Sequence, residues 1–169
     1  SGSVLDKKIV EKAMKDVDVV IHLAALTTHN DIIDKKFETL EINFLGTKNI
    51  LDAFHTSKTA KKFFYTSTGK VYGKIDNLPI TETHKTQPLN VLGKSKLITE
   101  QLINFYSDDN KEFIIFRIFN VYGPGQKENF LIFSIPSGVR CIFFSTKSAI
   151  WQNSLKFLNF DAVCKGCFL

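Results

Sequence analysis

Three consecutive hydroxyl side chains and one lysine are the residues of this chain whose types and spacing could do chemistry. Thr66, Ser67 and Thr68 end a short apolar run, and Lys96 stands near the start of a later apolar-periodic segment. A hydroxyl at the end of a buried strand can donate a hydrogen bond to a carbonyl or sugar oxygen. In an open α/β sheet, a lysine on the next helix faces the same crevice. The pattern favours a redox pocket at the end of a strand.

Each of these residues also has an ordinary structural explanation. Serine and threonine satisfy backbone groups in turns, and Gly69 follows Thr68 directly. Most helical lysines are exposed to solvent, and Lys96 could be one of them. A catalytic lysine would act on a titratable group one turn earlier on its face, but the residue four positions before Lys96 is Leu92. The residues alone leave both interpretations open.

Histidine, asparagine and cysteine residues give weaker indications. His22 ends an apolar run with no partner acid or metal set around it, which favours a hydrogen-bonded structural imidazole over a catalytic one. Asn43 falls in the middle of a predicted helix, where asparagine is a poor helix former. It either holds backbone or water near the strand ends or is simply tolerated. Cys164 and Cys167 form a CxxC without a second pair or a nearby histidine, so no metal site is predicted.

Apolar periodicity predicts the elements that must position these residues. Helices are expected within residues 4–17, starting after Asp6 as N-cap, over 31–54 and over 91–106. The last helix is expected to have an apolar side formed by Leu92, Leu97, Leu102, Ile103 and Phe105. Strands are expected over 18–25, 62–67 and 112–119, the first buried on both faces. This alternation predicts an incomplete, doubly wound parallel sheet in a three-layer α/β/α arrangement.

Length and composition set the remaining bounds. The 169 residues fit one domain, for which we expect a partial domain over 1–140 and a poorly specified tail over 141–169. The net charge of +5 is spread among acidic residues, so no nucleic-acid partner is predicted. No apolar run approaches the ~20 residues that span a bilayer, and no signal peptide opens the sequence, which predicts a cytoplasmic protein without membrane contact.

Five motifs, in order over residues 3–136, resemble the extended short-chain dehydrogenase/reductases, and most of all their NAD-dependent epimerase/dehydratase group, which includes UDP-glucose 4-epimerases. The motifs are residues 18–25, 43–51, 67–73, 93–100 and 117–125. The resemblance implies a Rossmann-like NAD-binding domain, a UDP- or dTDP-sugar as substrate, and a homodimer in the complete form. It also implies truncation at both ends, because the family's glycine-rich phosphate loop precedes the first motif and its substrate-closing lobe follows the last.

The resemblance assigns roles residue by residue. Thr68 is expected to bind the reacting oxygen with Ser67 close by, and Lys96 is expected to be the catalytic lysine. The cofactor-binding set is Leu23, Ala24, Ala25, Asn43, Thr66 and Lys96. The substrate-binding set is Thr68 and Asn120. The resemblance implies no metal.

One position departs from the family pattern. The tyrosine base of the family's Tyr-x-x-x-Lys motif falls on Leu92. The sequence therefore predicts either an epimerase or dehydratase that transiently oxidises its sugar, or a non-catalytic relative that binds nucleotide sugars or acts as a scaffold. A reductase of similar fold is a weaker third alternative. Without the preceding strands, the edge of the strand at 19–23 is free to pair with another chain.

Overall fold

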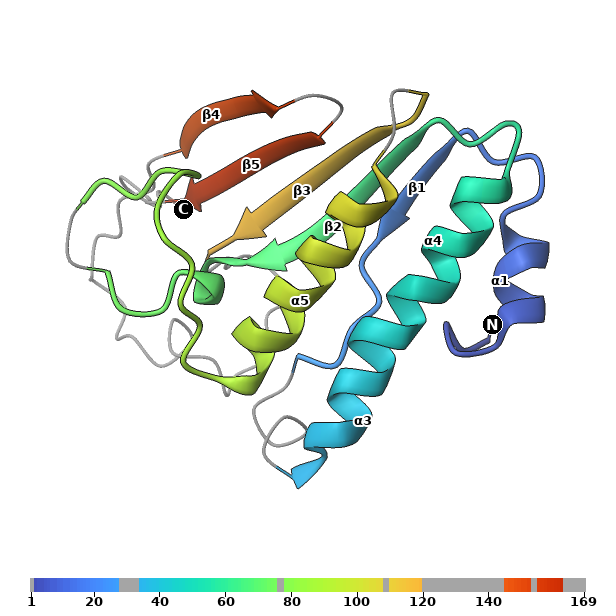
Figure 1. The fold of residues 1–169 in the computed structure, drawn as a ribbon, viewed down its shortest axis with the longest axis horizontal. Helices are drawn as coiled ribbons and strands as arrows, with labels where there is room; N and C mark the ends of the chain where they lie inside the picture. The colour runs from blue at the N-terminus through green and yellow to red at the C-terminus, as the bar shows by residue number, and fades with distance from the viewer. Residues whose placement is uncertain are drawn as a thin grey trace, which may run out of the picture.

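The computed structural model describes residues 2–27, 34–75, 78–107 and 110–119, together with the backbone of two strands, 145–152 and 155–162. Figure 1 shows the elements along the chain. They are α1 (Lys7–Ala13), β1 (Val19–His22), α3 (Lys36–Leu40), η1 (Glu41–Leu45), α4 (Gly46–Thr56), β2 (Lys62–Thr68), η2 (Gly69–Val71), α5 (Val91–Tyr106), β3 (Glu112–Ile118), β4 (Ser145–Gln152) and β5 (Leu155–Ala162).

The strands form one sheet in the order β1-β2-β3-β5-β4. The first three strands are parallel, with His22 opposite Tyr65 and Tyr65 opposite Ile115. Strand β5 continues the sheet parallel to β3, and β4 pairs antiparallel with β5. The Rossmann-like parallel sheet predicted from the sequence is therefore confirmed. The two added strands fall in the segment where the sequence predicted no elements.

Local signals explain where the helices begin. The Asp6 side chain accepts hydrogen bonds from the backbone N–H groups of Lys8 and Ile9, as predicted for the N-cap of α1. Asn90 caps α5 through Gly93 N, at 2.8 Å, and α5 has the predicted bounds. The long helix expected over 31–54 is α3, η1 and α4 within the described residues. Its middle is a π-helical turn, in which Gly46 N donates to Glu41 O five residues earlier.

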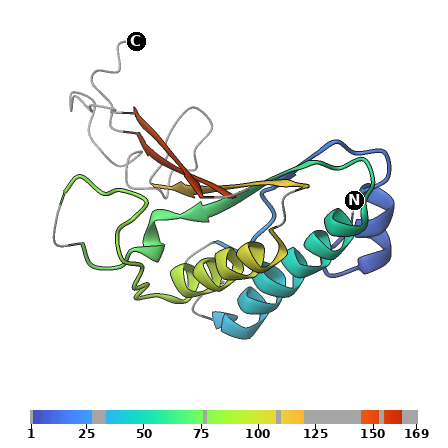
Figure 2. The same ribbon diagram turned by 45° about the horizontal axis from the view of Figure 1, so that its top comes forward.

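The core lies between the sheet and the helices on one of its faces. Figure 2 shows α3, α4 and α5 on the same side of the strands. Phe54 of α4 packs against Phe63 of β2 and Phe113 of β3, with ring centroids 5.3 and 5.4 Å away. Lys111 is also buried, and its Nζ donates to the carbonyl oxygens of Phe54 and Ser57 at the end of α4. These contacts fix α4 against the middle of the sheet.

Two burial predictions are wrong. Strand β1 was expected to be buried on both faces, but Val19 is 44% exposed and Ile21 65% exposed. The reason is that β1 is the outer strand of the sheet and the described helices beside it lie on one face. Phe105 was placed on the apolar side of α5 but is 86% exposed. The buried face of α5 instead carries polar residues, among them Lys96 and Glu100.

Among the described strands none pairs with the outer edge of β1, and this edge borders an apolar groove. A cavity of about 380 Å³ lies between α1 and β1, and its lining includes Val10, Met14, Val19 and Ile21. An apolar strand whose outer edge is not paired within the described residues is a template for pairing with another chain. We expect the 169-residue chain to associate in a concentration-dependent way, measurable by size-exclusion chromatography with light scattering.

A charge at this edge should weaken the association. Ile21→Lys is expected to reduce association through this edge, because a lysine on an edge strand opposes strand pairing. The matched control is Leu89→Lys, at a loop position that is 75% exposed. A monodisperse monomer of the unmodified chain with a sharp cooperative melt would contradict this prediction, as would equal effects of the two variants.

Candidate functional site

Three residues from different elements meet at the carboxyl ends of the parallel strands, where ligands of such sheets bind. Lys96 of α5 donates from Nζ to the carbonyl oxygen of Thr66 in β2, at 2.7 Å. The Thr66 hydroxyl donates to the carbonyl oxygen of His22 at the end of β1, at 3.1 Å. The structure therefore brings two of the predicted site residues, Thr66 and Lys96, into direct contact.

Lys96 is buried rather than solvated. It is 4% exposed, and its Nζ lies 4.7 Å from the centroid of the Tyr65 ring. Burial lowers the pKa of Lys96 to about 8, and the nearby charge of Glu100 acts in the opposite direction. The solvated-lysine interpretation is therefore wrong, and the amine is close to its titration range at neutral pH. Leu92, one turn earlier on α5, is also buried.

Ser67 and Thr68 lie on opposite faces of β2, as successive strand residues must. Thr68 is half-buried at the end of the strand, and its hydroxyl accepts a hydrogen bond from Lys70 N at 3.3 Å. Ser67 is 5% exposed on the helix-covered face, where its hydroxyl donates to Glu100. The structure does not bring Ser67 together with Thr68. The catalytic role of Ser67 stays a prediction. In the structure, the Ser67 hydroxyl stabilises the buried carboxylate of Glu100.

Asn43 links the segment after β1 to α5. Its Oδ1 accepts from Leu26 N at 2.8 Å, and its Nδ2 donates to Leu26 O at 3.1 Å and to Ser95 Oγ at 3.4 Å. The amide is 1% exposed, in the π-helical turn. The expectation that Asn43 holds backbone near the strand ends is confirmed. Its contact with a cofactor stays a prediction.

The residues between β1 and Leu26 are open to solvent. Leu23 is 67% exposed, Ala24 is exposed and Ala25 is half-buried. Because Asn43 holds Leu26 by both backbone groups, this short segment is anchored at one end by the strand and at the other by the amide. The small side chains of Ala24 and Ala25 leave room for a ligand to approach this anchored backbone closely. The three predicted cofactor-binding residues therefore lie on an accessible rim beside the Thr66–Lys96 contact.

His22 has the structural role that the sequence favoured. Its Nε2 lies 2.8 Å from Thr47 Oγ1. The Thr47 hydroxyl donates its single proton to the Asn43 carbonyl oxygen at 2.6 Å, so it accepts from an Nε2–H of His22. Burial, followed by the charge of Lys96, lowers the pKa of His22 to about 4. The imidazole is therefore neutral in the folded protein at neutral pH.

The neutral His22 makes stability depend on pH in a defined window. Below its ordinary pKa of 6.5, the unfolded chain gains a proton that the folded chain takes up only near pH 4. The free energy of unfolding should therefore fall as the pH drops through this window, by about 3 kcal/mol. Urea unfolding between pH 7 and 4 measures it, as the difference from His22→Gln, which lacks the titrating group. Parallel pH profiles of the two proteins would contradict the prediction.

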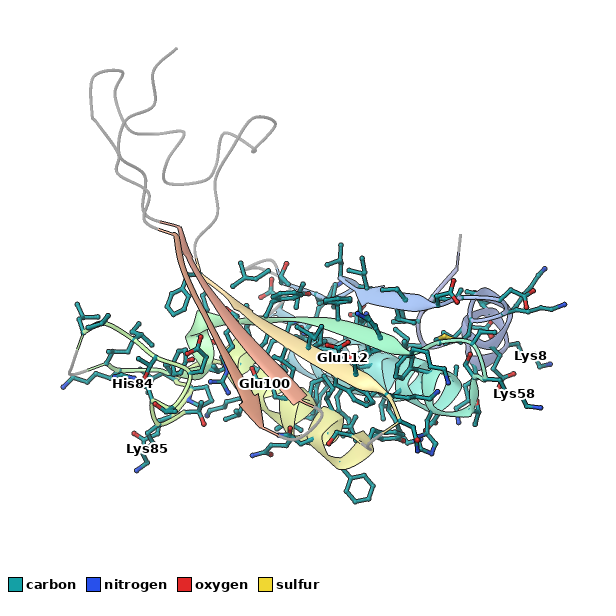
Figure 3. All side chains as sticks on the ribbon, turned by 90° about the horizontal axis from the view of Figure 1, so that it is seen from above. Lys8, Lys58, His84, Lys85, Glu100 and Glu112 are labelled. Atoms are coloured by element: carbon teal, nitrogen blue, oxygen red, sulfur yellow. The ribbon has the colours of Figure 1, made fainter. Side chains whose placement is uncertain are left out.

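An ion pair that the sequence did not predict is buried between α5 and β3. Arg117 Nη2 is 2.7 Å from Glu100 Oε2, and Arg117 Nη1 donates to the Tyr72 hydroxyl at 3.0 Å. The two charged side chains are 8% and 2% exposed. Figure 3 shows Glu100 within the body of the molecule and Lys8 and Lys58 at its periphery. The sequence contained one indication of this pair. Arg117 lies inside an apolar strand, and a charged side chain there needs a buried partner.

Several predicted residues lie outside the described part of the chain. Asn120 is one of them, and the CxxC at Cys164 and Cys167, for which no metal site was predicted, also lies there. Within the ranges that the structure describes, no group of three or more His, Cys, Asp and Glu side chains could hold a metal ion. None of the helices described there has the length and apolar character needed to cross a membrane.

Known proteins are similar to this chain in sequence and in fold. A sequence model of one enzyme family, described as GDP-mannose 4,6 dehydratase, matches residues 1–154. Human dTDP-D-glucose 4,6-dehydratase is 31% identical over 163 residues, covering 94% of this chain and 45% of the relative. The structure of RMD from Pseudomonas aeruginosa, complexed with NADPH, matches with a TM-score of 0.72 and 34% identity, over 79% of this chain and 46% of that one.

A second solved structure is of interest for its ligand. UDP-glucose 4-epimerase from Thermotoga maritima, solved with UDP-glucose, matches with a TM-score of 0.71 and 26% identity, over 76% of this chain and 43% of that chain. The chain spans less than half of the length of the curated relatives it matches, between 40% and 45% for three of them.

Proposed function

Because the chain belongs to the GDP-mannose 4,6 dehydratase family of NAD-dependent epimerases and dehydratases, we propose that it acts on a UDP- or dTDP-sugar with NAD as its cofactor. The proposal rests on the position of Lys96. This lysine is buried, and its Nζ donates a hydrogen bond to the Thr66 carbonyl oxygen at the carboxyl ends of the parallel strands. A buried amine with a lowered pKa in such a place is typical of a functional site.

The residues of the strand ends fit a dinucleotide. The exposed segment Leu23–Ala25 offers a close backbone approach, and Asn43 fixes its far end through Leu26. Lys96 supplies a cation that can donate to a ribose hydroxyl. Held by these residues, NAD would supply the reversible hydride chemistry that the transient oxidation of a sugar by an epimerase or dehydratase requires.

The chain's own residues would bind and polarise the sugar. The Thr68 hydroxyl, half-buried at the end of β2, can donate to the oxygen of the carbon that reacts. The ammonium of Lys96 favours negative charge developing on that oxygen. Asn120 would contact the phosphates of the sugar nucleotide.

A non-catalytic relative is the second candidate, and Leu92 is the observation that favours it. Leu92 occupies the family's tyrosine position, four residues before Lys96, and its apolar side chain is 6% exposed. A leucine cannot exchange a proton with the sugar. A chain with Lys96 and Thr68 but no base at position 92 can bind a nucleotide sugar without turning it over.

The proposed complete protein is a homodimer. Phe37, Leu45, Ile98 and Phe105 are large apolar side chains exposed on the helical layer, Phe37 by 90%. Ile98 and Phe105 are seven residues apart and therefore share one face of α5. Apolar side chains of this size on neighbouring helices fit a partner helix layer. The expected dimer contact is therefore on the side of the helices opposite the sheet.

Turnover with NAD and a panel of sugar nucleotides tests the proposal. The chain, extended by any coding sequence that flanks it, is incubated with NAD and UDP- or dTDP-sugars while NADH absorbance and the sugar products are followed. Loss of turnover in Lys96→Met and Thr68→Val, by roughly 10²–10⁴-fold each, supports the enzyme. Sugar-nucleotide binding without turnover supports the non-catalytic relative. Failure to bind NAD or any sugar nucleotide contradicts both.

A further inference from the structure

Three ionisable side chains are buried together between α5 and the sheet. Lys96 is 4% exposed, Glu100 2% and Arg117 6%. Lys96 and Glu100 are four residues apart, so they share one face of α5. Arg117 approaches from β3. With all three ionised, the cluster has two positive charges and one negative charge, each largely shielded from solvent.

Contacts from two strands fix the carboxylate of Glu100. Ser67 of β2 donates to Oε1, and Arg117 donates from Nε to both oxygens at 3.2 Å and from Nη2 to Oε2 at 2.7 Å. Arg117 is held in turn by the Tyr72 hydroxyl and by the Glu82 carbonyl oxygen. The negative charge therefore has a defined place, one turn along the helix from Lys96.

The other groups that face Lys96 provide little negative charge. On the β1 side stands His22, which is neutral, and on the β2 side are the Thr66 carbonyl oxygen and the ring of Tyr65. Arg117, on β3, is a cation. Among the described residues, Glu100 is the carboxylate whose charge acts on Lys96. An isolated buried ammonium tends to lose its proton, because burial disfavours the charged form.

We propose that Glu100 is a positioning residue for Lys96: held by Ser67 and Arg117, its carboxylate keeps the buried amine of Lys96 in the ammonium form at the strand ends. The importance of this charge for a reaction rests on the proposed function. The charge itself does not, because it can be measured on the chain without cofactor or substrate. Glu100 would touch neither ligand and would act through Lys96.

Direct titration of the Lys96 amine tests the proposal. The chain labelled with ¹³C and ¹⁵N in lysine gives a side-chain signal for Lys96 that is assigned by its loss in Lys96→Met. Glu100→Gln, which has the same shape and lacks the charge, should lower the titration midpoint by about one pH unit. A purely structural Glu100 would leave the midpoint in place in a folded variant. An unchanged midpoint in Glu100→Gln would overturn the proposal.

A second comparison covers the case in which Glu100→Gln does not fold. Arg117→Gln keeps the carboxylate, and the double variant Glu100→Gln/Arg117→Gln removes both charges. The Lys96 midpoint should be higher in Arg117→Gln than in the double variant, because Glu100 acts on Lys96 in the first and not in the second. Equal midpoints would contradict the proposal. As NAD and sugar are absent from both experiments, neither result depends on whether the proposed reaction occurs.

Discussion

Arg117→Met is expected to lower the free energy of unfolding by about 3–5 kcal/mol, since removing one partner of a buried ion pair leaves the other charge uncompensated. Glu100 would remain buried and would keep the hydrogen bond from Ser67, and the Tyr72 hydroxyl would lose its guanidinium donor. Urea unfolding at neutral pH, followed by far-UV circular dichroism, measures the loss. A change below about 1 kcal/mol would show that the pair is not buried in solution.

Two controls separate charge burial from other effects. The double variant Glu100→Leu/Arg117→Met should recover most of the loss, because apolar side chains of similar volume can replace a buried pair at little cost. Lys62→Met breaks a more exposed ion pair, in which Lys62 Nζ lies 3.2 Å from Glu112. Exposed pairs contribute about 0–1 kcal/mol, so this variant should remain close to the unmodified chain.

Leu92→Tyr is expected to raise turnover by roughly 10²–10⁴-fold, the usual contribution of a positioned general acid or base. The new phenol would lie four residues before Lys96, on the same face of α5. An ammonium within reach lowers the pKa of a phenol by favouring its charged form. The gain is measured with NAD and the sugar nucleotide that the chain binds, as NADH absorbance and altered sugar.

The expected gain depends on Lys96 and on the site of the substitution. Leu92→Phe adds a ring without a hydroxyl and should leave turnover unchanged, so it controls for packing at a position that is 6% exposed. Leu92→Tyr/Lys96→Met should lose the gain. Equal turnover in Leu92→Tyr and Leu92→Phe would show that the missing phenol is not what limits this chain.

Local features of the sequence were sufficient to predict most of the helices and strands. Helix α5 begins and ends where the sequence predicted, because its cap at Asn90 and its apolar period are both local. The mismatch of Asn43 with a helix interior likewise indicated a backbone contact, now seen with Leu26. The parallel order of β1, β2 and β3 followed from the alternation of strands and helices.

Partners distant in sequence could not be predicted in this way. Glu100 and Arg117 are on different elements, and neither residue identifies the other. Apolar periodicity predicted that Phe105 is buried and made no prediction for Lys96, because this pattern depends only on apolar side chains. The structure buries Lys96 and Glu100 instead, since each has a hydrogen-bond partner on the sheet. Burial of polar groups is decided by such pairs, which one sequence does not reveal.

The π-helical turn at Glu41–Leu45 makes the geometry of the strand ends sensitive to a single-residue deletion. The π-helical turn holds one residue more than a regular α-helical turn, so removing one residue would rewind it as regular α-helix and redirect the side chains within the turn. The Asn43 amide would swing away from Leu26, and the exposed rim at 23–25 would lose its anchor. The number of residues in this helical turn therefore determines whether the Asn43 side chain reaches the loop that follows β1.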